Sequence, residues 1–258
     1  MPIPLIVHGA AGRMGNVILR LALAEPGLAI HAGVDRVSGT LRALGVASDA
    51  PLLPVLPAVP GAVVIDFSHH SAFSAVAAHC AANGMALVSG TTGVPPAELA
   101  SALDAAAVRA PVLHAMNMSV GVNVVVKTAA HLAKALGPDY DIEIVEAHHN
   151  LKKDAPSGTA FAIADAILAA TGRTRADLVP GRDGDVGARR KGEIGVHALR
   201  LGDVVGDHSV YFVGNGERIL LGHVAHTRDL FAKGALRAAA WIAGRPPGRY
   251  VMADVLGL

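Results

Sequence analysis

One segment of the chain holds most of the side chains that could carry out acid–base chemistry. It spans residues 146–160 and reads EAHHNLKKDAPSGTA. The imidazoles of His148 and His149 can gain or lose a proton near neutral pH. The ammonium of Lys152 and a helix that starts at residues 157–159 both favour a bound anion. The segment therefore predicts a binding site for a carboxylate substrate beside a proton donor or acceptor.

A metal site and a plain capped helix are the other interpretations of this segment. Neighbouring residues of an extended chain point to opposite faces, so His148 and His149 are poorly placed to share one metal ion. The nearby sequence offers no clear third ligand, and we predict no metal. The structural alternative is a solvated loop followed by a capped helix that binds nothing.

A second motif lies near the start of the chain and could bind a dinucleotide. Residues 6–15 read IVHGAAGRMG, a strand followed by a glycine-rich turn that opens a helix. Glycine lets the backbone approach a pyrophosphate, and the N–H groups of the helix start point at the anion. Further on, Asp35 could accept a hydrogen bond from a ribose hydroxyl, and Arg36 could neutralise a 2′-phosphate. We predict NADH or NADPH as cofactor; the alternative is a tight turn without a ligand.

Two other predicted strand ends could contribute to the same site. Residues 89–93 read SGTTG, and ligands bind at the carboxyl ends of strands in sheets of this kind. Gly90, Thr91 and Thr92 could therefore lie against a nicotinamide, although a simple turn explains them equally well. Phe67, after another strand, could abut the cofactor. We interpret His8 as a packed strand residue, and the pair at 69–70 as exposed.

These motifs need a scaffold, and the first half of the chain predicts an α/β fold. Short aliphatic runs alternate with Ala-rich segments, as in a parallel sheet that is buried on both faces. The β-α-β order predicts a Rossmann-like, doubly wound parallel sheet. The expected strands are residues 3–7, 28–34, 63–66, 86–89 and 112–115, and the expected helices are 13–25, 71–83 and 96–109. Residues 48–60 contain four prolines and predict an extended connection.

The pattern changes after residue 118, which predicts a second, α+β domain with a mixed or antiparallel sheet. The expected helices are 120–136, 157–170 and 230–242, and the expected strands are 141–145, 194–200, 209–213 and 218–224. We expect Arg182, Arg189, Arg190 and Lys191 to form a solvated loop, with a subunit contact or a lid as the alternative. We expect His208 to be structural or interfacial.

Composition narrows the class of protein. The 258 residues include 22 Lys and Arg against 21 Asp and Glu, which argues against a polycationic surface for nucleic acid. A single cysteine forms no internal disulfide, and the start MPIPLIVHG lacks the basic region of a signal peptide. The stretch between Arg109 and Lys127 is shorter than the roughly 20 apolar residues that a membrane span needs. We expect a cytoplasmic protein that binds neither nucleic acid nor membrane.

Taken together, the motifs resemble those of a known family. GAAGRMG at 9–15, SGTTG at 89–93, NMSVGVN at 117–123 and the block at 146–160 are similar to the dihydrodipicolinate reductase (4-hydroxy-tetrahydrodipicolinate reductase) family. The resemblance implies an enzyme that reduces a cyclic dicarboxylate with NAD(P)H on the route to diaminopimelate and lysine. It also implies a homotetramer, a dinucleotide-binding domain of residues 1–118 and 229–258, and a substrate-binding and oligomerisation domain of residues 119–228.

The resemblance also implies roles for the matching residues. His148 would donate or accept a proton, and Lys152 would be the proton donor. The substrate carboxylates would be held by His149, Ser157, Gly158 and Thr159. The pyrophosphate would be cradled by Gly9, Ala10, Ala11, Gly12, Arg13 and Met14, and the adenosine ribose contacted by Asp35 and Arg36. The nicotinamide side would be formed by Gly90, Thr91, Thr92, Ala115, Met116, Asn117 and Met118.

The chain departs from the family pattern at two places. Asn150 and Leu151 stand where more polar or basic residues are common, and His70 stands where a proline is frequent. Two other functions stay open at this point. An amino-acid dehydrogenase of the aspartate or diaminopimelate type would share the first half, but would not explain the HHxxK block beside SGT. A non-catalytic dinucleotide-binding protein would bind the cofactor without turnover.

Overall fold

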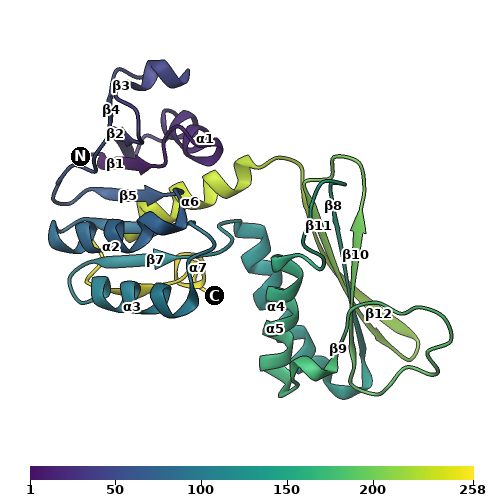
Figure 1. The fold of residues 1–258 in the computed structure, drawn as a ribbon. Helices are drawn as coiled ribbons and strands as arrows, with labels where there is room; N and C mark the ends of the chain where they lie inside the picture. Colours follow the sequence, from purple (N-terminus) through teal and green to yellow (C-terminus); the bar gives the residue numbers. More distant parts are fainter. The chain divides into compact units, whose positions relative to one another are not determined.

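The computed structural model describes residues 1–258, and they form two compact units (Figure 1). The first unit consists of Met1–Val120 and Asp229–Leu258, and the second of Gly121–Arg228. The chain therefore leaves the first unit, builds the second, and returns to complete the first. The first unit is a Rossmann-like α/β unit and the second contains a mixed sheet, which confirms the predicted fold class.

A mostly parallel sheet forms the centre of the first unit. Its strand order is β13-β7-β6-β5-β1-β2-β4-β3, and only the β3–β4 pair is antiparallel. The five predicted strands are present as β1 (Ile3–His8), β2 (Leu28–Val34), β5 (Val63–Asp66), β6 (Ala86–Ser89) and β7 (Pro111–His114). Every residue of β5 and β6 is buried, because helices cover both faces of the sheet.

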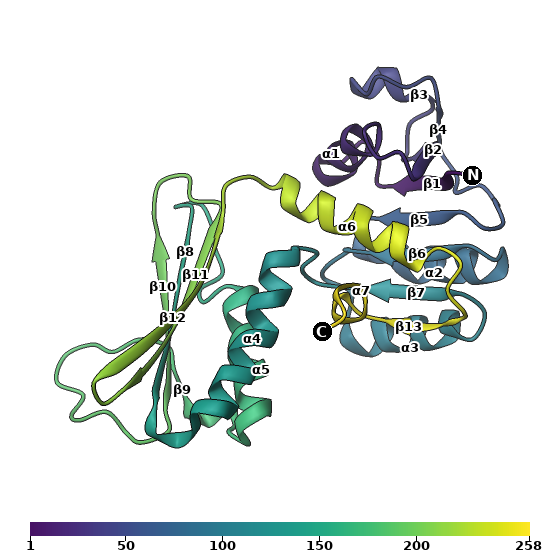
Figure 2. The ribbon, with the colours of Figure 1, turned by 180° about the vertical axis from the view of Figure 1, so that it is seen from behind.

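The helices of the first unit lie in two layers. The pair α2 (Phe73–Ala82) and α3 (Pro96–Ala107) packs on one face. The opposite face is covered by α1 (Arg13–Ala22), α6 (Asp229–Ile242) and α7 (Met252–Leu256), and α6 is seen crossing the sheet in Figure 2. A side chain at Gly234 of α6 would place its Cβ only 1.8 Å from the carbonyl oxygen of Met118. The glycine thus lets α6 lie directly on the backbone that follows β7.

Three short edge strands of this sheet are absent from the sequence prediction. β4 (Pro51–Leu53) and β3 (Gly39–Thr40) extend one edge, and β13 (Gly248–Tyr250) pairs with β7 at the other. The predicted extended connection at 48–60 therefore contains a strand. Pro51 is its first residue, a position that a proline tolerates because the missing N–H costs the least there.

The second unit is a five-stranded sheet with two helices on one face. The strand order is β12-β11-β8-β10-β9, with β10 parallel to β8 and β11 antiparallel to both β8 and β12. The strands are β8 (Asp141–His148), β9 (Leu178–Val179), β10 (Ile194–Arg200), β11 (Gly206–Gly214) and β12 (Glu217–Ala225). The helices are α4 (Val120–Leu136) and α5 (Gly158–Thr171). Figure 1 shows both helices on the same side of the sheet, where Ile144, Ile163 and Phe212 are fully buried.

The arginine-rich loop is exposed as predicted at Arg182, Arg190 and Lys191, but Arg189 is half-buried and departs from the prediction. Arg182 Nη2 lies 2.9 Å from the Glu143 carboxylate and 2.6 Å from that of Glu193, and Arg189 also pairs with both acids. The ion pairs form because Gly195, which has no side chain, leaves room on the sheet for the Glu143 carboxylate; a Cβ at Gly195 would collide with it. The partly buried Glu143 carboxylate attracts the guanidinium groups of Arg182 and Arg189.

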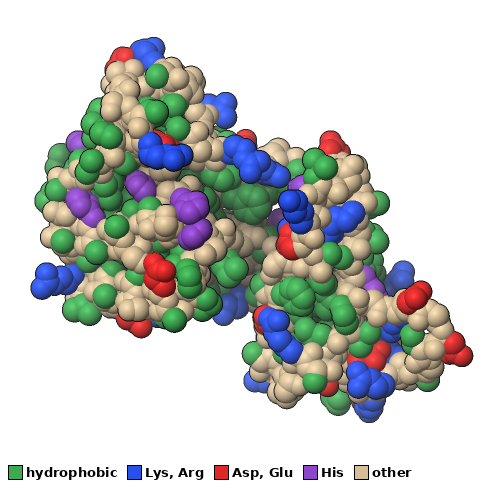
Figure 3. Space-filling view, in the orientation of Figure 1, with side chains coloured by type: hydrophobic (Ala, Val, Ile, Leu, Met, Phe, Trp, Pro, Cys, Tyr) green, Lys and Arg blue, Asp and Glu red, His purple; other side chains and the backbone are tan.

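The surface shows no dominant charged patch in the view of Figure 3. Lys and Arg side chains are scattered among apolar and acidic ones on that face, in keeping with a formal net charge of +1. None of the helices is both long enough and apolar enough to span a lipid bilayer.

Candidate active site

The glycine-rich turn after β1 is shaped by close backbone contacts. Gly9 has a φ of +81°, and a Cβ there would lie 2.6 Å from the carbonyl oxygen of Phe67. A Cβ on Gly15 would lie 2.1 Å from the carbonyl oxygen of Gly9. Helix α1 follows with Gly12 as its N-cap, without a side-chain cap and without an acid in its first turn. Its N-terminal N–H groups can therefore meet an anion, and this fits a dinucleotide pyrophosphate.

Asp35 and Arg36 lie beside this turn, at the end of β2. The Asp35 carboxylate accepts hydrogen bonds from the backbone N–H groups of Ala11 (2.9 Å) and Arg36 (2.8 Å). A carboxylate has about four acceptor sites, so room is left for a ribose hydroxyl. The Arg36 side chain is exposed on the same cavity. The pair is thus positioned as the sequence predicted, with one oxygen of the acid also fixing the glycine-rich turn.

A cavity of about 570 Å³ joins these residues at the carboxyl ends of the strands. Among the residues that line it are Gly9, Gly12, Asp35, Arg36 and Phe67, all expected from the sequence. The cavity also reaches His8 and His69, for which the sequence predicted a packed strand and an exposed loop. His69 is exposed and caps a short 3-10 helix by accepting from the N–H of Ser71.

Asp66 ties three strand ends together below the cavity. Its side chain is fully buried and accepts hydrogen bonds from His8 Nδ1 (2.8 Å), Ser68 Oγ (2.6 Å), Ser89 Oγ (2.9 Å) and Thr91 Oγ1 (2.8 Å). Burial alone would raise the pKa of this carboxyl, but the hydrogen bonds from His8, Ser68 and Thr91 outweigh it and hold the pKa below its usual value. The loops after β1, β5 and β6 are therefore fixed by one charge.

The predicted nicotinamide-side residues fall into two groups. Gly90 is needed for the Phe67 ring, because a Cβ there would lie 2.3 Å from the ring. The hydroxyl of Thr91 is committed to Asp66, and Met118 is buried in the core, so neither side chain faces solvent. The more accessible residues, half-buried or exposed, are Thr92, Ala115, Met116 and Asn117. Of the set, these four offer side chains to a ligand.

The second cluster lies in the second unit, where β8 ends beside the start of α5. Strand β8 continues to His148, three residues beyond its predicted end, so Glu146 and His148 point to the same face. His148 Nδ1 lies 2.6 Å from Glu146 Oε2. Glu146 is fully buried and also accepts from the guanidinium of Arg200 (3.0–3.1 Å) and the N–H of Ser157 (3.0 Å).

His208 completes this cluster from β11. Its ring contacts that of His148 edge-on, with centroids 5.2 Å apart, and its Nε2 lies 3.2 Å from Ser157 Oγ. Burial is the main cause that lowers the pKa of His208 to about 4, and repulsion from a protonated His148 ring would act in the same direction. His208 is therefore neutral at physiological pH and holds the Ser157 hydroxyl without adding charge to the site.

The remaining predicted residues surround the helix start. Lys152 Nζ donates to both carboxylate oxygens of Asp154 (2.8 and 2.9 Å) and is largely buried, with 21% of its side chain exposed. Ser157 is the N-cap of α5 and accepts from the N–H of Ala160. Gly158 is exposed, and His149 and Thr159 are half-buried around it. An anion at this helix end would meet backbone N–H groups beside an ammonium and an imidazole.

Three members of this cluster were not found from the sequence: Glu146, Arg200 and His208. The signal for Glu146 was present, since it stands two residues before His148 in a strand and so shares its face. Arg200 and His208 come from β10 and β11, and no local pattern indicates that these strands flank β8. No cluster of three or more His, Cys, Asp and Glu side chains has the geometry to hold a metal ion.

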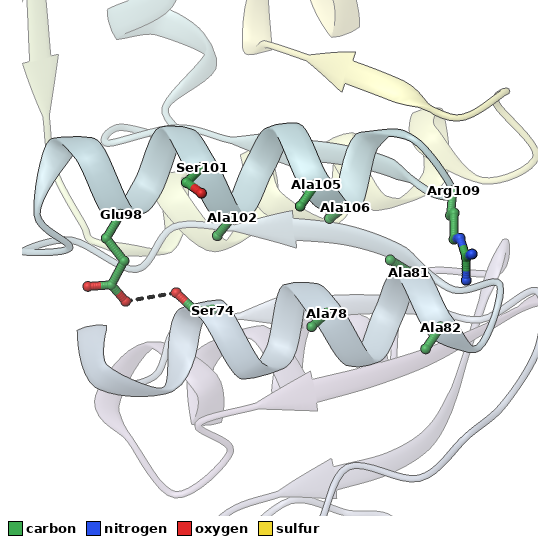
Figure 4. A pocket seen from close by; sticks show the side chains of 10 residues that line it. All are labelled: Ser74, Ala78, Ala81, Ala82, Glu98, Ser101, Ala102, Ala105, Ala106 and Arg109. Atoms are coloured by element: carbon green, nitrogen blue, oxygen red, sulfur yellow. Dashed lines mark hydrogen bonds between the residues drawn. The ribbon is translucent and has the colours of Figure 1, made fainter.

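A further hollow, of about 430 Å³, lies between α2 and α3 (Figure 4). Alanines line most of its length, and the hydrogen bond from Ser74 Oγ to Glu98 (2.7 Å) closes one end. It shares no lining residue with the cavity that holds Asp35 and Arg36, and it offers no convergent polar groups. We therefore place the chemistry elsewhere.

Fold and site together define a class, that of two-domain oxidoreductases with a dinucleotide-binding, Rossmann-like first unit. Family models narrow this further. The model described as "Dihydrodipicolinate reductase, N-terminus" matches residues 3–118, and "Dihydrodipicolinate reductase, C-terminus" matches residues 121–256. The chain belongs to the dihydrodipicolinate reductase family.

Full-length relatives agree with this assignment. The 4-hydroxy-tetrahydrodipicolinate reductase of Myxococcus xanthus is 49% identical over 98% of this chain and 97% of its own length. That of Desulfovibrio desulfuricans is 48% identical over 99% of this chain and 100% of its own. Among solved structures, a dipicolinate-bound dihydrodipicolinate reductase from Paenisporosarcina sp. TG-14 has the same fold, with a TM-score of 0.79 and 24% identity over 98% of this chain and 99% of its own.

The depressed pKa of His208 gives the fold a pH dependence with a definite sign. Between pH 6.5 and about 4 the unfolded chain binds a proton at this histidine and the folded chain does not. The free energy of unfolding should therefore fall as the pH drops through this window, by up to ~3 kcal/mol from this group. Urea unfolding across this range should show a shallower fall in His208→Gln than in the wild type. If the free energy of unfolding fell equally with pH in both proteins, the lowered pKa of His208 would be contradicted. The difference between the two proteins at neutral pH measures any general destabilisation by the substitution.

Proposed function

We propose that this protein reduces 4-hydroxy-tetrahydrodipicolinate to tetrahydrodipicolinate with NADH or NADPH, in the biosynthesis of diaminopimelate and lysine. The full-length relatives that carry this name support the reaction. The observation that carries it furthest is the Glu146–His148 pair beside the N-terminus of α5, which joins a proton-exchanging group to an anion site. A cyclic substrate with two carboxylates matches both features.

The first unit fits the cofactor. The turn at residues 9–14 and the uncapped start of α1 would hold the pyrophosphate, and Asp35 and Arg36 the adenosine ribose. Phe67 and the accessible residues among Gly90, Thr92 and 115–117 would lie toward the nicotinamide. The bound cofactor supplies the hydride, and the protein contributes orientation and electrostatics.

The second unit would bind the substrate and manage the proton. His149, Ser157, Gly158 and Thr159 would hold the carboxylates at the helix start. Loss of the 4-hydroxyl group as water would give the unsaturated ring of dihydrodipicolinate. Hydride addition at its C4 would leave negative charge on the conjugated enamine, and a proton must neutralise it. We assign that proton to Lys152, with His148 assisting. The reductase from Paenisporosarcina sp. TG-14 binds dipicolinate, a planar dicarboxylate, which supports a ligand of this class.

Removing either proton-handling side chain should affect turnover more than cofactor binding. In Lys152→Ala or His148→Ala we expect kcat to fall by ~10²–10⁴-fold, the usual range for a lost general acid. The Kd for NADPH should stay close to that of the wild type. The assay follows NADPH absorbance with substrate generated from pyruvate and aspartate semialdehyde. Near-normal turnover in either variant would remove that residue from the mechanism, and no turnover in the wild type would refute the function itself.

Arg36 is assigned to the 2′-phosphate that distinguishes NADPH from NADH. Its exposed guanidinium lines the cavity beside Asp35. Arg36→Ala should therefore weaken NADPH binding by roughly 10-fold or more and leave NADH nearly unchanged, because a charge-assisted hydrogen bond is worth about 1.5–3 kcal/mol. Fluorescence titration with both cofactors measures this. An equal loss for the two would exclude Arg36 from phosphate recognition.

We also propose a homotetramer built through the second unit. The sheet face opposite α4 and α5 exposes a set of apolar side chains: Leu199, Val213, Leu220 and Val224. Such a face favours burial against another copy. Sedimentation velocity should give the mass of a tetramer for the wild type and a smaller species for Leu220→Lys with Val224→Lys. A monomeric wild type would contradict the proposal.

A further inference from the structure

We propose that Glu146 is a positioning residue that sets the orientation and the tautomer of His148. The inference rests on the proposed function, because it concerns the proton-handling side chain of that reaction. It is carried by the geometry around a single buried carboxylate, and by the space that Gly206 leaves on the far side of the imidazole ring.

The two oxygens of Glu146 face different partners. Oε1 accepts from the N–H of Ser157 (3.0 Å) and from both Nη atoms of Arg200 (3.1 Å each). Oε2 faces His148 Nδ1 at 2.6 Å, with Arg200 Nη1 also 3.0 Å away. An ionised carboxylate only accepts hydrogen bonds, so Nδ1 must carry the hydrogen. The exchangeable position of the neutral ring is therefore Nε2.

The ring is also held on its other side. A Cβ at Gly206 would lie 3.0 Å from His148 Nε2, closer than a side-chain carbon normally packs. The ring of His208 stands edge-on against that of His148, with an interplanar angle of 78°. Only 12% of the His148 side chain is exposed. The ring thus has one available orientation, with Nε2 directed into the space beside Gly206.

The same carboxylate also fixes the anion site. Its bond to the N–H of Ser157 anchors the N-cap of α5, and Arg200 in turn donates to the backbone carbonyls of Lys152 and Asp154. One buried charge therefore sets the distance between the proton-exchanging nitrogen, the helix N-terminus and the lysine loop. Misplacement of such groups by ~1 Å can lower a rate by ~10²-fold.

Glu146→Gln tests the tautomer directly. The donors Arg200 and Ser157 require the amide oxygen at the Oε1 position, which turns the amide NH₂ toward His148 Nδ1. That nitrogen must then accept, so the neutral ring should switch to the Nε2–H tautomer. ¹⁵N NMR of histidine-labelled protein, with His148 assigned from a His148→Gln spectrum, reports the tautomer without any activity. A wrong tautomer can cost up to ~10⁴-fold in a comparable buried pair, and we expect kcat to fall at least ~100-fold with an unchanged Kd for NADPH.

A matched control is Glu143→Gln. Glu143 lies on the same strand, faces the opposite side of the sheet, and also pairs with an arginine, Arg182 (2.9 Å), and a histidine, His197 (2.6 Å). The Glu143→Gln variant loses a similar set of ion pairs but should leave the His148 tautomer unchanged.

Gly206→Ala supplies a second variant that keeps every hydrogen bond of Glu146 and tests the space beside Nε2. It should fold and keep the Nδ1–H tautomer, yet lower kcat by roughly 10-fold through displacement of the ring. If Glu146→Gln does not fold, Gly206→Ala still tests the proposal. A wild-type kcat in Gly206→Ala would then overturn it. An Nδ1–H tautomer retained in Glu146→Gln would overturn it as well. An inactive wild type with the expected tautomer switch would refute only the function.

Discussion

A carboxylate can stay ionised inside a protein only where enough donors replace the water it has lost. Glu146 meets this condition with a guanidinium, an imidazole and a backbone N–H, and this constraint decides the geometry of the second unit's site. Burial opposes its charge, yet the hydrogen bonds from Arg200 and His148 keep the pKa of Glu146 below its usual value. Each donor is held in place by the need to satisfy the acid, and so β8, β10 and the start of α5 are held together as well.

The first unit uses the same principle at another strand end. Asp66 is buried beneath the cavity and is satisfied by donors from the ends of β1 and β6 and from its own loop. In both units the buried charge lies one layer below the groups that would touch a ligand. The arrangement leaves Asp35, Arg36 and His148 free to interact while their supporting loops remain fixed. Glycines also contribute to both sites, because the lack of a side chain at Gly9, Gly90 and Gly206 leaves room for a neighbouring group.

Much of this architecture could be predicted from the sequence, because the signals were local. Aliphatic runs bounded by turns located the five main strands of the first unit, and helix α4 and strand β10 begin and end where the pattern predicted. The edge strands β3, β4 and β13 were missed because two or three residues carry no periodicity. Of the candidate site, the residues on one continuous segment were found. Arg200 and His208 could not be found, because strand order brings them to His148 from more than fifty residues away in the chain. The solvated-loop prediction was wrong for Arg189 alone, because the charge of a loop does not reveal the acid beneath it.

The return of the chain to its first unit has a consequence for how the protein is made. Helix α6 contributes Ala235, Leu236 and Ile242 to the core of that unit, and β13 completes its sheet edge. Both are translated after the whole second unit, at ~5–20 residues per second. During synthesis one apolar face of the earlier strands is therefore covered by α1 alone, while the inserted unit has all of its own elements. The second unit is thus expected to complete its folding before the first unit does. Chaperones that shield apolar surface would be needed most by residues 1–120, which leave the ribosome first.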